Sequence, residues 1–108
     1  MGNEQGDLQN LGRFAEPSVA ILVSLAAGPR HGYAMIEDIA AFSGVRVGAG
    51  TLYSAIARLE ERGLIAPVPS DDRRRPYRLT ERGQTVLREQ LAQLHSFVAT
   101  GQARLVTS

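Results

Sequence analysis

The sequence contains no cysteine, no tryptophan and no lysine. Without cysteine, the chain cannot itself form a disulfide, a thiolate zinc site, an iron–sulfur cluster or a thiol redox sensor. Its two histidines, His31 and His95, stand far apart in the sequence, so we expect no metal site and no cofactor. No nucleophile–base pair, pair of catalytic acids or glycine-rich phosphate loop can be assembled from the spacing of the polar residues. We therefore expect a protein that is not an enzyme.

Long apolar runs are also missing. No run approaches the roughly 20 residues that a membrane-spanning helix needs. The first ten residues are polar and lack the apolar core of a signal peptide, which favours a cytoplasmic protein. A chain of 108 residues, of which 44% are hydrophobic and 21% charged, is typical of one globular domain.

The net charge is only +1, but all 12 basic residues are arginine. The planar guanidinium group suits phosphates and guanine edges, although compositional bias is the simpler explanation for the absence of lysine. The only basic cluster is Arg73, Arg74 and Arg75. It is either a solvated turn with local charge pairs or a set of phosphate contacts.

Two helices are predicted in the first half of the chain. The apolar run 18–27 follows Pro17 and predicts a helix buried on more than one side, which Gly28 ends. A second helix begins near residues 31–32 and ends near Phe42, because its apolar residues recur every three or four positions.

The start of this second helix, His31–Gly32–Tyr33, has two interpretations. In the structural one, His31 caps the helix, Gly32 permits a close approach and Tyr33 is a half-buried anchor. In the functional one, Tyr33 contacts a phosphate, since the N–H groups at a helix start favour anions.

A third helix is predicted over residues 49–62. Leu52, Ile56 and Leu59 form its core stripe. The opposite face is small at its N-terminal end and cationic at its C-terminal end, as suits a helix that enters a DNA groove. The predicted outer residues are Thr51, Ser54, Ala55, Arg58 and Arg62.

A hairpin is predicted next, with strands at 64–68 and 77–79 joined by a polar turn that holds the three arginines. Pro69 and Pro76 bracket this turn, which predicts that both strands are edge strands.

Thr80 is the predicted N-cap of a last helix, which runs from Glu81 to about Ala99 and frays at Gly101. Its apolar stripe has no obvious partner within the chain that is long enough to cover it. A second copy of the chain is the simplest cover. The predicted dimerisation residues are Leu87, Leu91, Leu94 and Val98, and a small ligand could lodge beside them near Gln93, His95 and Phe97.

Together these parts suit a protein that inserts one helix into the DNA major groove and lays a hairpin on the flanking phosphates. Arg58 is the best candidate to reach a guanine edge. Tyr53 either packs its ring on the second helix or donates its hydroxyl to a phosphate. The predicted DNA-binding residues are Tyr33, Thr51, Tyr53, Ser54, Arg58, Arg73, Arg74 and Arg75. The low net charge leaves open a module that binds protein instead of DNA.

Four motifs, in this order, resemble the PadR family of transcriptional regulators. They are Gly-Pro-Arg-His-Gly-Tyr at 28–33, Gly-Thr-Leu-Tyr at 50–53, Leu-Glu-Glu-Arg-Gly-Leu-Ile at 59–65 and Tyr-Arg-Leu-Thr-Glu-Arg-Gly at 77–83. The likeness covers roughly residues 20–94, and the single C-terminal helix is similar to the family's smaller subgroup.

The resemblance implies a mainly α fold with a small β-hairpin: a winged helix-turn-helix domain at 15–80 and a C-terminal dimerisation helix and tail at 81–108. Residues 1–14 are then an N-terminal tail in which Leu8, Leu11 and Phe14 would allow a short helix.

The resemblance also implies a homodimeric repressor on a palindromic operator in double-stranded DNA, released by a small aromatic effector, with no membrane partner. A ligand slot lined by tryptophan, as in some multidrug-binding members, is excluded by composition. The stretch 71–75 also resembles MarR-type regulators, which we keep as the second alternative.

Overall fold

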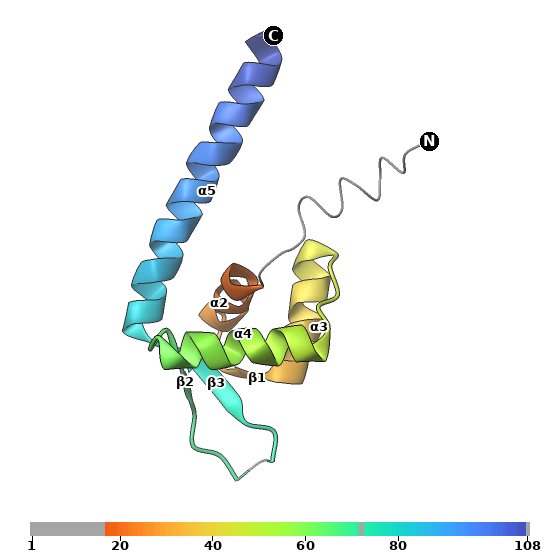
Figure 1. The fold of residues 1–108 in the computed structure, drawn as a ribbon, viewed down its shortest axis with the longest axis vertical. Coiled ribbons are helices and arrows are strands. Elements are labelled where there is room, and N and C mark those ends of the chain that lie inside the picture. Colours follow the sequence, from red (N-terminus) through yellow and green to blue (C-terminus); the bar gives the residue numbers. More distant parts are fainter. Residues whose placement is uncertain (1–16, 72, 108) are drawn as a thin grey trace.

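The structure is a computed structural model, and it describes residues 17–71 and 73–107. The elements in chain order are α2 (Ser18–Ala26), β1 (Arg30–His31), α3 (Gly32–Ser43), α4 (Ala49–Glu61), β2 (Ile65–Pro67), β3 (Pro76–Leu79) and α5 (Glu81–Thr107). Figure 1 shows the first three of these helices gathered around the small sheet, while α5 extends away from them as a long arm. The short helix expected around Leu8–Phe14 lies outside the described residues.

The core is built from the apolar faces of α2, α3 and α4. Its fully or almost fully buried side chains include Ile21, Leu22, Met35, Ile39, Leu52, Ile56 and Ile65. The predicted stripe of α4 is therefore confirmed. Ala55, however, was expected on the outer face and is completely buried. It lies three residues after Leu52 and four before Leu59, which places it on the same helix face as both.

The sheet has three antiparallel strands in the order β1-β3-β2. The expectation that both hairpin strands are edge strands is wrong for β3, because β1 pairs with its other side. Pro76 opens β3 opposite His31, and its carbonyl accepts a hydrogen bond of 2.9 Å from the N–H of Val68. A proline is tolerated in this central strand because it stands at the first position.

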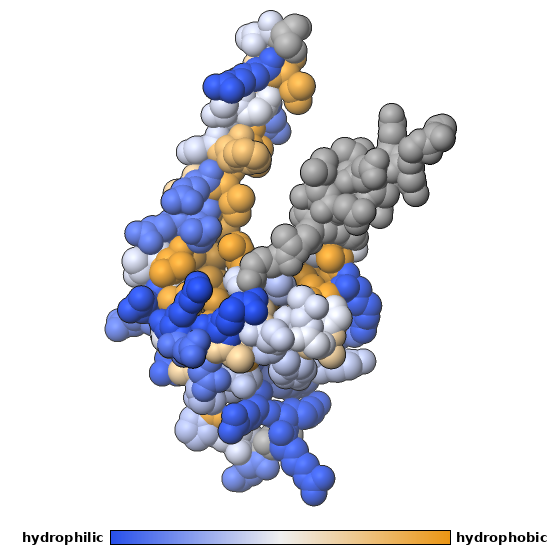
Figure 2. Space-filling model, in the orientation of Figure 1, coloured by the Kyte–Doolittle hydropathy of each residue, from blue (hydrophilic) through white to orange (hydrophobic). Residues whose placement is uncertain are grey.

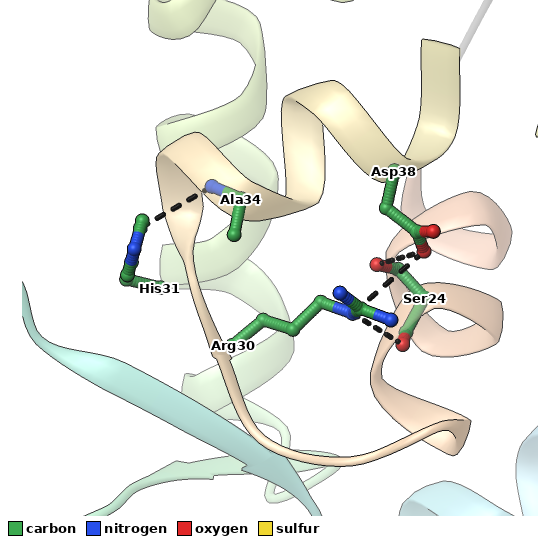
Figure 3. A network of polar contacts seen from close by, with 5 residues as sticks. All are labelled: Ser24, Arg30, His31, Ala34 and Asp38. Atoms are coloured by element: carbon green, nitrogen blue, oxygen red, sulfur yellow. Dashed lines mark hydrogen bonds and ion pairs between the residues drawn. The ribbon is translucent and has the colours of Figure 1, made fainter. Parts of the chain in front are cut away.

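A polar network fixes β1 against two helices (Figure 3). The buried hydroxyl of Ser24 in α2 donates to Oδ2 of Asp38 in α3 at 2.7 Å. Arg30 in β1 donates from Nε to the carbonyl oxygen of Ser24 at 3.2 Å, and the same Nε lies 3.8 Å from Asp38 Oδ2. The Arg30 and Asp38 side chains are about one-third exposed, so the network closes the edge of the core.

Removal of the Asp38 carboxylate should destabilise the fold. In Asp38→Ala, the Ser24 hydroxyl stays buried without its acceptor, and we expect a loss of about 1–3 kcal/mol in chemical unfolding. Glu37→Ala is the matched control. Glu37 pairs with Arg46 at 2.7 Å, and this contact lowers the pKa of the Glu37 carboxyl, but the pair is exposed and should add little to stability. Equal effects of the two substitutions would contradict this view of the network.

The first turn of α5 is anchored to the α4–β2 junction. As predicted, Thr80 caps the helix: its Oγ1 accepts from the N–H of Gly83 at 3.0 Å and donates to the carbonyl of Gly63 at 2.7 Å. A Cβ at Gly83 would collide with the carbonyl oxygen of Leu64 and would lie 2.8 Å from Leu79 Cδ1. Only glycine at position 83 lets α5 approach Leu64 this closely.

Gly83→Ala should therefore destabilise the protein, although alanine is the better helix former. The carbonyl oxygen of Leu64 is a backbone atom and cannot rotate away from the added methyl group. We therefore expect the free energy of unfolding, measured by heat or urea, to fall by about 1–3 kcal/mol. Gly101→Ala provides the comparison within the same helix, because a Cβ there meets nothing within 4 Å. That variant should be as stable as wild type or slightly more stable. A wild-type stability for Gly83→Ala would refute the packing argument.

The predicted end of the last helix is wrong. α5 continues through Gly101 to Thr107, 27 residues in all. One glycine inside a helix costs only about 1 kcal/mol, which the flanking turns offset. The expectation that the whole stripe lacks an intrachain partner is also wrong for Leu87, which is buried in the core. Further along, Leu91, Leu94 and Val98 are 45%, 46% and 52% exposed.

Candidate nucleic-acid interface

The outer face of α4 is polar and uncovered in the monomer. Thr51, Tyr53, Ser54 and Arg58 are all exposed, opposite the buried stripe. Thr51, Ser54 and Arg58 lie three and four residues apart on one side of the helix, so this side carries two hydroxyl groups followed by a guanidinium, and Tyr53 lies at its margin. This is the arrangement that the sequence predicted, except for the buried Ala55.

The second part is the loop between Pro67 and Pro76, which we call the wing. It carries Arg73, Arg74 and Arg75, all of them exposed. In Figure 1 the wing extends beyond the helical body at the end opposite the C-terminus. Figure 2 shows hydrophilic side chains gathered on this end of the molecule. Such a projecting cationic loop can approach a phosphate backbone without steric obstruction by the helices.

A cleft of about 350 Å³ joins the wing to the starts of α3 and α4. Its lining residues are His31, Tyr33, Tyr53, Arg73, Arg74, Arg75 and Tyr77. Five of the eight predicted DNA-binding residues thus come together in one concavity. Thr51, Ser54 and Arg58 do not line it and lie on the neighbouring α4 surface. The lining side chains offer guanidinium, phenol and imidazole groups, all of which can donate hydrogen bonds to an anion.

The start of α3 has the local structure expected of a capped helix. His31 is extended, with φ −84° and ψ 165°, and its Nδ1 accepts a hydrogen bond from the N–H of Ala34 at 3.2 Å. A Cβ at Gly32 would lie 2.6 Å from Cζ of Tyr53. The capping role of His31 and the close approach at Gly32 are therefore confirmed, and the Tyr53 ring packs on α3.

Two of the three tyrosines that line the cleft keep access to solvent, whereas Tyr77 is buried. Tyr53 is 49% exposed although its ring rests on Gly32. Tyr33 is 60% exposed, so the interpretation of Tyr33 as a half-buried anchor is wrong. Tyr33 lies near Arg46, whose pKa is raised chiefly by its hydrogen bond with Glu37 and slightly by Tyr33. The sequence did not single out Tyr77 as a lining residue, because pairing with β1 and β2 positions it.

A second, shallow hollow lies along the distal half of α5, and all of its lining residues belong to this one helix. It is lined by Gln93, Ser96, Phe97, Thr100, Gly101 and Arg104. Gln93 and Phe97 belong to the predicted ligand surroundings, whereas His95 does not line this hollow. Because one helix face alone lines it, this hollow does not by itself surround a ligand in the way that a binding pocket does.

None of the described helices combines the length and the apolar character needed to cross a membrane. Within residues 17–71 and 73–107, no three histidine, aspartate or glutamate side chains are grouped so that they could hold a metal ion.

Two helices, a third helix with an exposed polar face and an arginine-bearing hairpin next to it define a winged helix-turn-helix domain. Residues 21–89 match the model of the transcriptional regulator PadR-like family, and the chain belongs to this family. The resemblance inferred from the motifs is thereby confirmed, and the MarR-type alternative is set aside.

Individual relatives agree with this assignment. The chain has a TM-score of 0.69 and 28% identity to a transcriptional regulator from Clostridium thermocellum, over 77% of this chain and 86% of that one. A PadR family transcriptional regulator from Eggerthella lenta gives a TM-score of 0.65 and 34% identity, over 80% of each chain.

A relative known from sequence is much longer. The chain is 43% identical over 75 residues to an uncharacterized 37.1 kDa protein in transposon TN4556 of Streptomyces fradiae. That match covers 69% of this chain but only 22% of the Streptomyces protein.

Proposed function

We propose that this protein is a homodimeric, sequence-specific DNA-binding repressor that a small aromatic effector releases from its operator. The observation that carries the proposal is the cleft in which Tyr33 and Tyr53 meet the three wing arginines. Through Tyr53, this cleft connects α4 with the wing, so that both belong to one surface. A duplex that receives α4 therefore also lies beside the wing.

In this proposal α4 enters the major groove. An α-helix with its side chains is roughly 10–12 Å wide, which fits the roughly 12 Å groove of B-DNA. Thr51 and Ser54 are short and allow close approach to base edges, and Arg58 reaches a guanine. The wing contacts flanking phosphates through Arg73, Arg74 and Arg75, with Tyr33 and Tyr53 as neutral donors. The net charge of +1 does not oppose this, because local clustering of charge governs the approach of DNA.

The dimer is proposed to form through α5. Leu91, Leu94 and Val98 recur at spacings of three and four on the part of the helix that leaves the domain, which gives a continuous apolar seam. Figure 2 shows hydrophobic side chains following the arm on the side that faces the body. Covering this seam with the same seam of a second copy gives a two-fold dimer and therefore a roughly palindromic operator.

For the effector, we propose a site that includes the exposed surface of α5 around Phe97 and Arg104. Since it lies on the arm that sets the spacing of the two α4 helices, a ligand there would change operator affinity by linkage. An aromatic acid that raises the melting temperature of the free protein should weaken the operator complex. If no ligand in a library of aromatic acids changes the DNA affinity, the proposal of an effector is wrong.

DNA binding is tested with a duplex selected by the wild-type protein from a random library, followed by fluorescence anisotropy. Arg58→Ala should weaken binding by about 1–3 kcal/mol per subunit and relax the preference at one base pair of each half-site. Arg88→Ala, which removes an exposed arginine of α5 outside the cleft, is the matched control and should bind normally. Failure to select any duplex would favour a protein-binding module instead.

A further inference from the structure

His31 caps α3 and also lines the cleft. It comes from the short strand β1, where successive side chains point to opposite sides. Figure 3 shows Arg30 turned toward Ser24 and Asp38, and His31 turned away from them. Arg30 thus belongs to the core network, whereas His31 is a lining residue together with Tyr53 and the wing arginines.

The cap fixes which nitrogen of His31 carries the proton. Nδ1 accepts a hydrogen bond from the N–H of Ala34 at 3.2 Å, so it must be unprotonated. In a neutral imidazole the proton then resides on Nε2, and this N–H is the ring's one donor, which the cap does not use. The ring is held in place by the cap at Nδ1 and by the pairing of its backbone with Pro76.

We propose that His31 binds a DNA phosphate as a neutral donor through Nε2–H, beside the wing arginines. This inference rests on the proposed function, because it takes the duplex backbone to lie in the cleft. The arginines supply the charge, and the imidazole supplies a donor of fixed direction. One side chain thereby sets the start of α3 and orients the duplex against α4.

A neutral donor predicts a particular signature in the salt dependence. Each lost cation–phosphate contact flattens the plot of log K against log salt by about 0.9, whereas loss of a neutral hydrogen bond lowers affinity without changing the slope. A hydrogen bond to a charged group corresponds to roughly a tenfold or larger change in affinity per subunit.

His31→Ser separates the two roles, because serine is also a strong N-cap but cannot reach across the cleft. With the selected duplex, we expect a wild-type melting temperature, binding weakened at least tenfold and an unchanged salt slope. His31→Ala should lose both stability and affinity. Binding of His31→Ser at wild-type strength, while Arg58→Ala and the wing variants bind weakly, would overturn this inference alone. Wild-type binding by all of these variants would overturn the proposed function itself.

Nitrogen-15 NMR of the wild-type protein gives a second readout that does not depend on a variant. We expect the Nε2–H tautomer at His31 in the free protein, and slower exchange of this proton with solvent when DNA is added. An Nδ1–H tautomer, or an Nε2 proton whose exchange DNA does not slow, would contradict the inference.

Discussion

Replacement of Arg73, Arg74 and Arg75 by alanine should weaken DNA binding a hundredfold or more at about 0.1 M salt. The three guanidinium groups line one cleft on the projecting wing, so they would neutralise adjacent phosphates. In a dimer with about eight phosphate contacts, the slope of log K against log salt should be near −7. Loss of three contacts per subunit should bring it to about −2.

The control for this experiment is the corresponding triple lysine variant. It retains the charge but not the planar fork, so its slope should stay close to that of wild type while its affinity falls moderately. The folding of all three proteins should be alike, since the arginines are exposed. If the alanine variant kept the affinity and slope of wild type, the wing would have no part in DNA binding.

Placing charge on the apolar seam of α5 should abolish both dimerisation and tight DNA binding. Leu91 and Leu94 are each nearly half exposed in the monomer, so the double variant Leu91→Asp/Leu94→Asp should still fold. Two copies would then bring four carboxylates into one apolar contact, which is prohibitive without partners. A single subunit binds one half-site, and the loss of bivalency should weaken operator binding by about a hundredfold to ten-thousandfold.

Sedimentation analysis and anisotropy on the same samples test this prediction. The control is Ala92→Asp/Ala99→Asp, which places two charges on exposed positions of α5 away from the seam. It should remain dimeric and bind the operator normally. A seam variant that sediments as a dimer would place the interface elsewhere on the molecule.

The sequence predicted the helices well because their signals are local. The core stripe of α4 and the Thr80 cap follow from spacing and from single side chains, and both are present. β1 escaped prediction because two residues have no periodicity, and only pairing with β3 makes them a strand. The sequence predicts that α5 runs to about Ala99 and frays at Gly101, which is too short because one glycine weakens a helix only slightly.

The candidate site was predicted in its parts but not as a whole. The outer face of α4 and the basic turn can each be recognised from the residues. The cleft that joins them brings His31, Tyr53 and Arg75 together from distant positions, so no local pattern contains it. Leu87 also shows that a local pattern does not reveal tertiary contacts. Its spacing places it in the apolar stripe of α5, which was predicted to bind a second copy, but the core of its own chain buries it.

In the proposed dimer, paired α5 arms hold two α4 helices at a fixed separation. Hydroxyl-radical footprinting of the wild-type protein on the selected duplex tests this arrangement most directly. We expect two symmetric protected regions, centred about 10 base pairs apart or slightly more, with two chains bound per duplex. A single protected region occupied by one chain would contradict it.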